Sequence, residues 1–319
     1  MYINIRTLCC LWSFTLASSS CLQATWLPNS YESSSNETIF NMMSSLKDEG
    51  IQRVYVDVWN QGNVYFSSPT IQSIVPSSQG DDHLLWALNA GKMLNIDVFA
   101  WFEYGLMTSY GGLNNGFAQY ANNQGWILGE YNNFYWMDPR NSNVLIFLSS
   151  IMNDAIIGYT NQGLKGVQLD DHFASPVSLG RNSTDMTNAA SYIHSQISSS
   201  SIVLSLSPST LSFAYNTYNV DWNLWGNLSY FDELIPQLYY TSFKSFKSEY
   251  DYTMQTLTDL SMNKWIASGI RVDGTGASTE WNEVNNMIEY CNTYNQGAIV
   301  WYTKGILETY PAEFQNIWD

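Results

Sequence analysis

The chain has 319 residues, of which 45% are hydrophobic and only 13% are charged. This composition excludes a chain that stays unfolded in water, because apolar burial can offset the loss of chain entropy. Twelve basic and 28 acidic residues give a net charge of −16, which repels nucleic-acid phosphates and anionic membrane surfaces, so we expect neither as a partner. Phe, Tyr and Trp make up 15% of the chain, which suits a protein that stacks sugar rings on aromatic side chains.

The N-terminal residues have the pattern of a secretory signal peptide. Arg6 is the one charged residue among the first 24, and the apolar run 8–17 is followed by small residues. This pattern predicts cleavage between about residues 17 and 24. The apolar run is too short to span a bilayer. We therefore expect a signal peptide over 1–20, then one domain over 21–319, secreted as a monomer with no membrane segment after signal removal.

Cysteines and sequons add two expectations for a secreted chain. Cys9 and Cys10 fall in the signal, whereas Cys291 remains and Cys21 remains if cleavage precedes it. A disulfide between these last two would join the chain ends and constrain the unfolded state. The sequons begin at Asn36, Asn182 and Asn227, so we expect a glycoprotein if the source secretes through an endoplasmic reticulum. No cysteine spacing typical of zinc or iron–sulfur sites occurs, and we expect no metal and no cofactor.

A repeating unit runs along the rest of the chain: an apolar strand, a polar loop and a stretch with helical spacing. The predicted strands are 23–27, 53–59, 95–102, 165–169, 202–207, 234–240, 264–269 and 297–302. The predicted helices are 37–49, 82–94, 143–160, 186–198, 245–261 and 281–293. Strands that alternate with helices pair in parallel through right-handed crossovers. No glycine-rich dinucleotide loop follows any strand, so the α/β pattern favours a single (β/α)8 TIM barrel over an open doubly wound sheet.

Active sites of such barrels lie at the carboxyl ends of the strands. The third strand ends in Glu103 and the fourth in Asp170-Asp171-His172, while the second ends at Asp57. Cleavage of a glycosidic bond needs one carboxyl to protonate the leaving oxygen and usually a second to attack or to activate water. Adjacent carboxylates also raise each other's pKa, which helps one of them to stay protonated. We predict Asp170, Glu103 and Asp171 as catalytic residues.

Other side chains at these strand ends have two interpretations each. Trp101, Tyr104, Tyr239 and Tyr302 fit sugar-stacking platforms, but ordinary packing would explain them equally well. His172 either assists proton transfer or makes a structural hydrogen bond. The Asp pair itself could instead cap the next segment or bind a cation. Asp138 is expected to cap the helix that starts near Asn141.

Four runs of the chain resemble the glycosyl hydrolase-like family 10, secreted or surface barrels found largely in bacteria. The runs are IDVFAWFEYGLM (96–107), GVQLDDHFASP (166–176), LSLSPSTLSFAYNTYNVDWNLW (204–225) and LIPQLYY (234–240). The resemblance covers about residues 23–319. It implies that Glu103 and the Asp170-Asp171 pair line the site, with Gln237 and Tyr239 nearby. Two departures are Asp138-Pro139, where relatives usually read Asn-Pro, and Lys165-Gly166, where they commonly read Asp-Gly.

The functional hypothesis is a secreted glycoside hydrolase that cleaves O-glycosidic bonds of a polysaccharide or cell-wall glycan. Asp170 would be the nucleophile or transition-state stabiliser and Glu103 the general acid. A substrate-assisted variant, in which an acetamido group attacks, stays open. The alternative is a catalytically inactive barrel that binds glycan. A metal-dependent deacetylase is disfavoured, because it needs a histidine-rich ligand set and the chain has only His83, His172 and His194.

Overall fold

The computed structural model describes residues 21–29, 35–197, 201–259 and 264–317, so the expected signal peptide lies outside the described residues. Within them, an eight-stranded sheet has the order β11-β10-β9-β5-β2-β1-β13-β12. All neighbouring strands of this sheet pair in parallel, and its strands are β1 (Gln23–Leu27), β2 (Arg53–Asp57), β5 (Asp97–Phe102), β9 (Leu164–Asp170), β10 (Val203–Ser207), β11 (Glu233–Leu234), β12 (Ala267–Arg271) and β13 (Gly297–Trp301).

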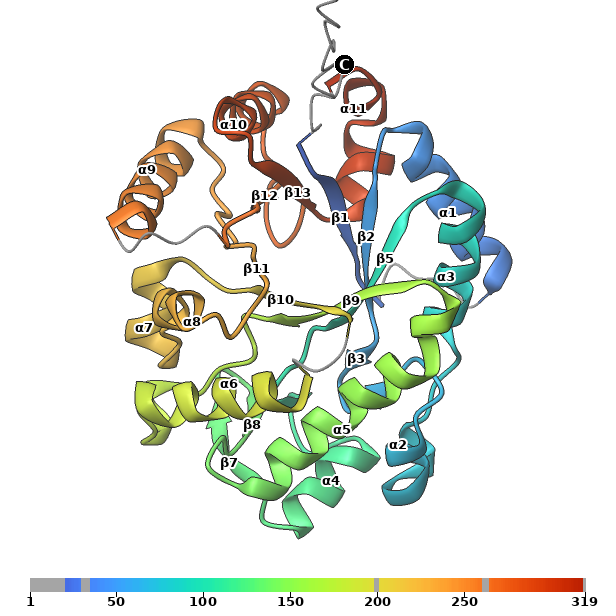
Figure 1. Ribbon diagram of the computed structural model, residues 1–319, viewed down its shortest axis with the longest axis vertical. Helices are drawn as coiled ribbons and strands as arrows, with labels where there is room; N and C mark the ends of the chain where they lie inside the picture. Colours follow the sequence, from blue (N-terminus) through green and yellow to red (C-terminus); the bar gives the residue numbers. More distant parts are fainter. Residues whose placement is uncertain (1–20, 30–34, 198–200, 260–263, 318–319) are drawn as a thin grey trace, which may run out of the picture.

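The two edge strands of this sheet meet and close it into a barrel. Isolated parallel bridges join Leu234 to Trp265 and Gln237 to Gly269. Helices surround the strands (Figure 1). Their bounds are α1 (Asn36–Asp48), α2 (Pro69–Ile74), α3 (His83–Leu94), α4 (Gly116–Asn123), α5 (Ser142–Tyr159), α6 (Ser183–Ile197), α7 (Leu211–Tyr218), α8 (Trp222–Asn227), α9 (Phe243–Asp259), α10 (Trp281–Thr293) and α11 (Pro311–Ile317). The predicted α/β class and (β/α)8 barrel are therefore confirmed.

Helix starts in this barrel carry side-chain caps. Ser35 accepts a hydrogen bond from the backbone N–H of Thr38 before α1, and Asp82 accepts one from Leu85 before α3. Asn141 caps α5 in the same way. Each cap satisfies a backbone donor that has no partner within its helix. We had expected Asp138 to cap this helix, and this prediction was wrong. Its two oxygens bind Arg181 at 2.8 and 2.6 Å instead.

Strand alternation divides the buried side chains into two cores. In β5, Val98, Ala100 and Phe102 face the surrounding helices, whereas Phe99 and Trp101 fill the barrel interior. This is the two-residue period of a strand whose faces are both buried. The interior has room for the Phe99 ring because Gly166 stands opposite on β9: a Cβ at this glycine would lie 2.1 Å from a ring carbon.

Two predicted strands differ from the structure. The segment 234–240 forms a strand only over its first residue, as part of β11, and strand 264–269 is displaced to β12. Pro236 has no N–H to donate to a sheet, which interrupts regular pairing. The segment still closes the barrel, because Gly269 N donates to the carbonyl of Pro236 at 2.9 Å and Leu238 N donates to that of Gly269 at 3.0 Å.

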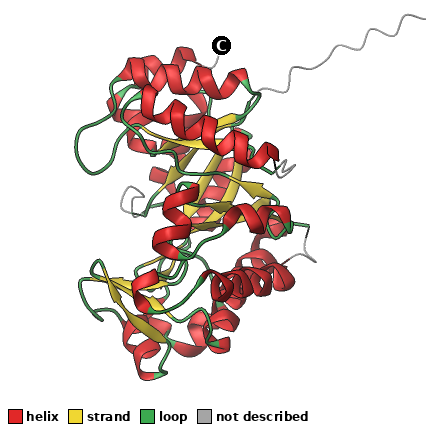
Figure 2. Cartoon of the chain, turned by 90° about the vertical axis from the view of Figure 1, so that its left-hand side faces the viewer, coloured by secondary structure: helices red, strands yellow, loops and turns green. Residues whose placement is uncertain are grey.

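A small antiparallel sheet between β5 and α5 was not predicted. It has the order β6-β8-β7 and contains β6 (Met107–Tyr110), β7 (Ile127–Tyr131) and β8 (Phe134–Met137). Figure 2 shows it at the lower left, apart from the central strands. A second short ribbon pairs β3 (Trp59–Asn60) with β4 (Asn63–Val64). Both follow carboxyl ends of barrel strands, so they build up the rim where the site was expected.

Two further expectations concern the membrane and the cysteines. Among the described residues one helical segment, Ser142–Gln162, is long and apolar enough to cross a membrane by length and composition. Its apolar side packs into the core, and 56% of its most apolar 18 residues are buried. Cys21 and Cys291 are both free thiols in this structure, so the disulfide considered above is not formed.

The opposite end of the barrel holds a buried ion pair. Arg53 Nη1 lies 3.0 Å from both carboxylate oxygens of Glu233 and 3.1 Å from the hydroxyl of Tyr55. Its guanidinium also lies 4.1 Å from the centre of the Phe99 ring. Both charged side chains are under 15% exposed. A charge buried this deeply needs its partner, because the interior does not replace the water it has lost.

Candidate active site

A cleft of about 630 Å³ opens at the carboxyl ends of the barrel strands. Its walls come from the segments after β1, β2, β5, β12 and β13, and its lining residues are Pro28, Asn29, Asn60, Gln61, Glu103, Tyr104, Gly274, Thr275, Trp301 and Tyr302. The lining combines aromatic rings, amides and one carboxyl group. The cleft is therefore where the chemistry of this barrel should be sought.

Glu103 enters the cleft from a tightly constrained turn after β5. The backbone N–H of Tyr104 donates to the carbonyl of Trp59 at 3.0 Å, and that of Leu106 donates to His172 at 3.0 Å. Gly105 between them has φ +45°, and a Cβ there would lie 2.6 Å from the His172 backbone. The glycine of the WFEYG run thus lets the turn approach the segment after β9 and fixes the position of Glu103.

Asp57, at the end of β2, forms a carboxyl pair with Glu103. Asn60 Nδ2 donates to Asp57 Oδ2 at 2.7 Å and also to Glu103 Oε2. This amide therefore bridges the two carboxyl groups and holds them next to each other. Asp57 is 0% exposed and accepts one more bond, from the backbone N–H of Asn29 at 3.3 Å. Two carboxyl groups held this close raise the pKa of one of them, because two adjacent anions would repel each other.

Of the two carboxyl groups, Glu103 has the more strongly raised pKa. Burial raises the pKa of Glu103 well above its usual value, and the charges of Asp57, Asp170 and Asp171 raise it further. Burial also raises the pKa of Asp57, to about 6, but the bonds from Asn60 and Asn29 oppose this rise. Glu103 is therefore the acid of the pair and Asp57 the nearby negative charge.

Asp170 lies at the end of β9 and is 4% exposed. Its Oδ1 accepts a hydrogen bond of 2.6 Å from Gln237 Nε2, and this amide also lies 3.2 Å from both oxygens of Ser207. Burial raises the pKa of Asp170 well above its usual value, and the charges of Asp171 and Asp57 add to the rise. The carboxyl group is thus oriented by the Gln237 amide.

Asp171 points to a different partner from that of Asp170. Its Oδ2 accepts a 2.8 Å bond from Ser209 Oγ, and its Oδ1 lies 3.7 Å from His172 Nε2. His172 Nδ1 in turn lies 3.1 Å from the backbone carbonyl of Glu103. Asp170, Asp171 and His172 offer ligand atoms within 4.8 Å of one another, the one such group in the described part of the chain. Gln237 donates to Asp170 and Ser209 donates to Asp171, so hydrogen bonds from neighbouring side chains orient both carboxyl groups.

The predicted substrate-binding residues divide into three groups. Tyr104 and Tyr302 line the cleft beside Glu103. Gln237, Tyr239 and His172 lie around the neighbouring Asp170-Asp171 pair. Burial raises the pKa of Tyr239, and the charges of the two aspartates raise it further. Trp101 is 0% exposed and belongs to the barrel interior, which corrects its interpretation as an open stacking platform.

Trp301, which we did not select, takes the place of Trp101 as the tryptophan of the cleft. It is partly exposed, lines the cleft, and stacks on Tyr239 with 5.9 Å between ring centres. Trp101 packs beneath it, edge to face, at 5.9 Å. Asp57 was also missed, although the sequence held a signal. It is the one charged residue of the run VYVDVW (54–59) and ends its strand, as Glu103 follows the third strand.

The fold and the site together define a TIM-barrel protein of the glycosidase type. The carboxyl pair, the second carboxyl group on β9 and the aromatic cleft lie at one end of the barrel. The chain belongs to the family described as glycosyl hydrolase-like 10, whose model matches residues 21–201 and 194–278. The resemblance stated from the sequence is thereby confirmed. No curated protein matches the chain in a sequence search.

Solved structures support the same fold. The PgaB (BpsB) glycoside hydrolase domain from Bordetella bronchiseptica superposes with a TM-score of 0.65 at 9% identity, covering 94% of this chain and 99% of that one. An endo-1,4-β-D-mannanase from Thermotoga petrophila gives 0.61 at 12% identity, with 88% of each chain covered. A GH18 chitinase from Pseudoalteromonas aurantia gives 0.54 at 14% identity, with 92% and 97% covered. At such low identities the likeness concerns the fold alone.

Proposed function

We propose that the protein is a secreted glycoside hydrolase that cleaves O-glycosidic bonds of a polysaccharide or cell-wall glycan. The observation that carries the proposal is the Glu103–Asp57 carboxyl pair, bridged by Asn60, with Glu103 facing the cleft. A protonated carboxyl group at the edge of a sugar-sized cleft is the general acid that glycosidic cleavage requires. Family membership and the glycosidase folds of the structural neighbours support the same class of reaction.

In this mechanism Glu103 donates its proton to the leaving oxygen. The nearby charge of Asp57 keeps Glu103 protonated until the oxygen develops negative charge. Asn60 donates to both carboxyl groups and so stabilises the anion that Glu103 becomes. Asp170, oriented by Gln237, is the second carboxyl group, and in its ionised form it acts as nucleophile or as stabiliser of positive charge on the sugar ring.

The cleft lining favours a neutral glycan. Tyr104, Trp301 and Tyr302 offer ring faces, while Asn29, Asn60 and Gln61 offer amide donors and acceptors. None of the lining residues is basic, and four carboxyl groups lie in or beside the cleft. Sulfated or uronic-acid polymers would be repelled by this charge, whereas neutral or N-acetylated sugars would not.

Secretion is a separate part of the proposal and rests on the N-terminal pattern of residues 1–24. We expect the mature protein to begin between residues 18 and 25, and N-terminal sequencing of protein recovered from culture medium tests this. The three sequon asparagines, Asn36, Asn182 and Asn227, are all exposed. Expression in a eukaryotic host should therefore give glycosylated protein, detectable as a mass loss after deglycosylation.

The decisive experiment measures release of reducing ends from a panel of plant, fungal and bacterial glycans. The wild-type protein is compared with Glu103→Gln, Asp170→Asn and the surface control Glu289→Gln. We expect activity that falls about 10³-fold or more in the first two variants and is unchanged in the third. Activity that survives both site variants would overturn the assignment. Binding of one glycan without turnover would favour the inactive glycan-binding alternative.

A further inference from the structure

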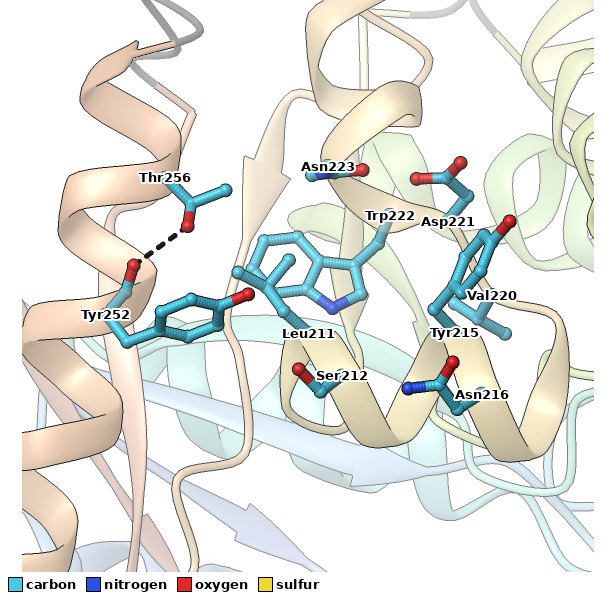
Figure 3. Close-up of a pocket in the computed structure, with 10 residues that line it drawn as sticks. All are labelled: Leu211, Ser212, Tyr215, Asn216, Val220, Asp221, Trp222, Asn223, Tyr252 and Thr256. Carbon is cyan, nitrogen blue, oxygen red and sulfur yellow. Dashed lines mark hydrogen bonds between the residues drawn. The ribbon is translucent and has the colours of Figure 1, made fainter.

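A second hollow lies outside the barrel mouth, between α7, α8 and α9. It has a volume of about 320 Å³ and is called here the helical groove. Figure 3 shows the residues that line it, which are Leu211, Ser212, Tyr215, Asn216, Val220, Asp221, Trp222, Asn223, Tyr252 and Thr256. It shares no lining residue with the catalytic cleft. Its chemistry therefore needs an explanation of its own.

Two exposed tyrosines stand on opposite sides of the helical groove. Tyr252 reaches in from α9, and Tyr215 stands at the other end, on α7 (Figure 3). They are 51% and 48% exposed, although large aromatic side chains usually bury most of their surface. Two exposed rings that flank a hollow offer faces on which the C–H groups of a sugar ring can pack.

Several polar side chains between the tyrosines are not used in hydrogen bonds to the described part of the chain. Within the described residues no side-chain hydrogen bond involves Ser212, Asn216 or Asn223, nor the hydroxyl of either tyrosine. Asp221 accepts one long bond, 3.4 Å, from the backbone of Leu224 and keeps its other oxygen unused. In Figure 3, Asn223 and Asp221 lie on one side of the hollow and Ser212 and Asn216 on the other. A ligand with many hydroxyl groups would satisfy these donors and acceptors.

The same lining excludes other ligand classes. It contains no Lys, Arg or His, so an anion such as a phosphate would meet Asp221 without a compensating positive charge. A purely apolar ligand would leave the amides and hydroxyls buried without partners, which is unfavourable. Neutral carbohydrate combines the apolar ring face and the hydroxyl groups that this lining matches.

The floor of the helical groove contacts the segment after β10, which binds Asp171. Trp222 is 1% exposed, and its indole N–H donates to the backbone carbonyl of Ser209 at 3.0 Å. The hydroxyl of Ser209 donates to Asp171 at 2.8 Å. The groove thus rests on the segment that follows β10, at the same end of the barrel as the cleft. A polymer bound in one could extend toward the other.

We propose that the helical groove is a second carbohydrate-binding site, which holds a neutral segment of a glycan outside the catalytic cleft. Tyr215 and Tyr252 pack against sugar rings, and Asn216, Asn223 and Asp221 bind their hydroxyl groups. The site increases the affinity for long chains and leaves the chemistry at Glu103 unchanged. Because it concerns binding only, it does not depend on the protein being a hydrolase.

Affinity electrophoresis tests the proposal with soluble neutral glycans cast into the gel: hydroxyethyl cellulose, a galactomannan and a soluble β-glucan. The full protein is compared with Tyr215→Ala/Tyr252→Ala and with Asn216→Ala/Asn223→Ala, a pair whose side chains make no internal hydrogen bond. Tyr294→Ala is the matched control, because this exposed tyrosine follows α10 and lines neither the helical groove nor the cleft. We expect at least one glycan to retard the wild type, and Kd to rise about tenfold in both double variants but not in the control.

Three results would overturn the proposal. The first is that no glycan of the panel retards the wild-type protein. The second is that both double variants bind as tightly as the wild type. The third is that the Tyr294→Ala control loses as much affinity as the groove variants, because the effect would then not be local. Loss of binding in Tyr302→Ala with intact binding in the groove variants belongs to the second case and would place all binding in the cleft.

Discussion

Replacing Asp57 by asparagine tests the carboxyl pair most directly. The change removes a negative charge while keeping the shape of the side chain. Since one amide nitrogen, Asn60 Nδ2, binds both carboxyl groups, their oxygens lie about 5 Å apart or less. Two unit charges at this distance interact by about 3 kcal/mol at an effective dielectric constant of about 20. In the wild type this repulsion opposes the ionisation of Glu103. In Asp57→Asn it is absent, so Glu103 ionises more easily.

The assay is the pH dependence of kcat/KM on a soluble substrate, which reports the acid of the free enzyme. Because Asp57 raises the pKa of Glu103, its removal should move the alkaline limb to lower pH by at least about one pH unit. Activity at acidic pH should change much less than activity at pH 8. Asp97→Asn, an exposed aspartate at the other end of β5, is the control and should leave the profile in place.

An alkaline limb that stays in place in Asp57→Asn would refute the reasoning. It would mean that Asp57 and Glu103 do not interact by charge in solution, or that another group provides the acid. A limb that moves to higher pH would also refute it, since no contact in the site gives that sign. Circular dichroism of the variant at both pH values excludes unfolding as the cause of a change.

The raised pKa values of Glu103 and Asp170 also predict that the free energy of unfolding falls as pH rises from about 4 through their folded-state pKa values, since the unfolded chain releases these protons first. Glu103→Gln should reduce this fall, so that its Tm gains on the wild type at pH 8 relative to pH 5. Glu233→Gln should cost about 3 kcal/mol in urea unfolding, because it leaves Arg53 buried without its carboxylate, whereas the double variant Arg53→Met/Glu233→Leu should regain most of that loss. A single-variant cost under about 1 kcal/mol would contradict this account. Gln237→Ala should reduce kcat about 10²-fold with little change in KM, because it releases Asp170; an unchanged kcat in steady-state measurements would show that the amide does not orient it.

The sequence predicted the strands of this barrel well wherever both faces of a strand are buried. The segments 23–27 and 53–57 are buried over all or almost all of their length, and both were placed within two residues. The segment 234–240 was predicted too long, because its composition is strand-like while Pro236 limits its pairing. The small sheet over 107–137 was not predicted at all. This sheet lies outside the strand–loop–helix repeat on which the prediction was based. Its position depends on contacts with the barrel rim, which the sequence pattern does not show.

The site residues, too, were predicted where a local pattern was sufficient and missed where their surroundings depend on the fold. Glu103 and the Asp170-Asp171 pair were selected because each charge ends an apolar run, and the structure brings them close enough for their charges to raise the pKa of Glu103. Trp101 was misjudged, since strand alternation places it inside the barrel beside Phe99, and a sequence does not tell how far up the barrel its layers are filled. The partner of Asp171, Ser209, depends on the fold of a later loop, which local patterns cannot give.

The small antiparallel sheet has a consequence for how this protein could diversify. Its β8 residues Phe134 and Trp136 lie about 6 Å, between ring centres, from Tyr104 or His172, so the sheet forms a wall next to the site without contributing a carboxyl group. The catalytic candidates all sit at the ends of barrel strands. Exchange of this sheet among related barrels would therefore alter which glycans are accepted and leave the reaction itself in place. It would be the region to recombine when a new specificity is wanted from an unchanged catalytic frame.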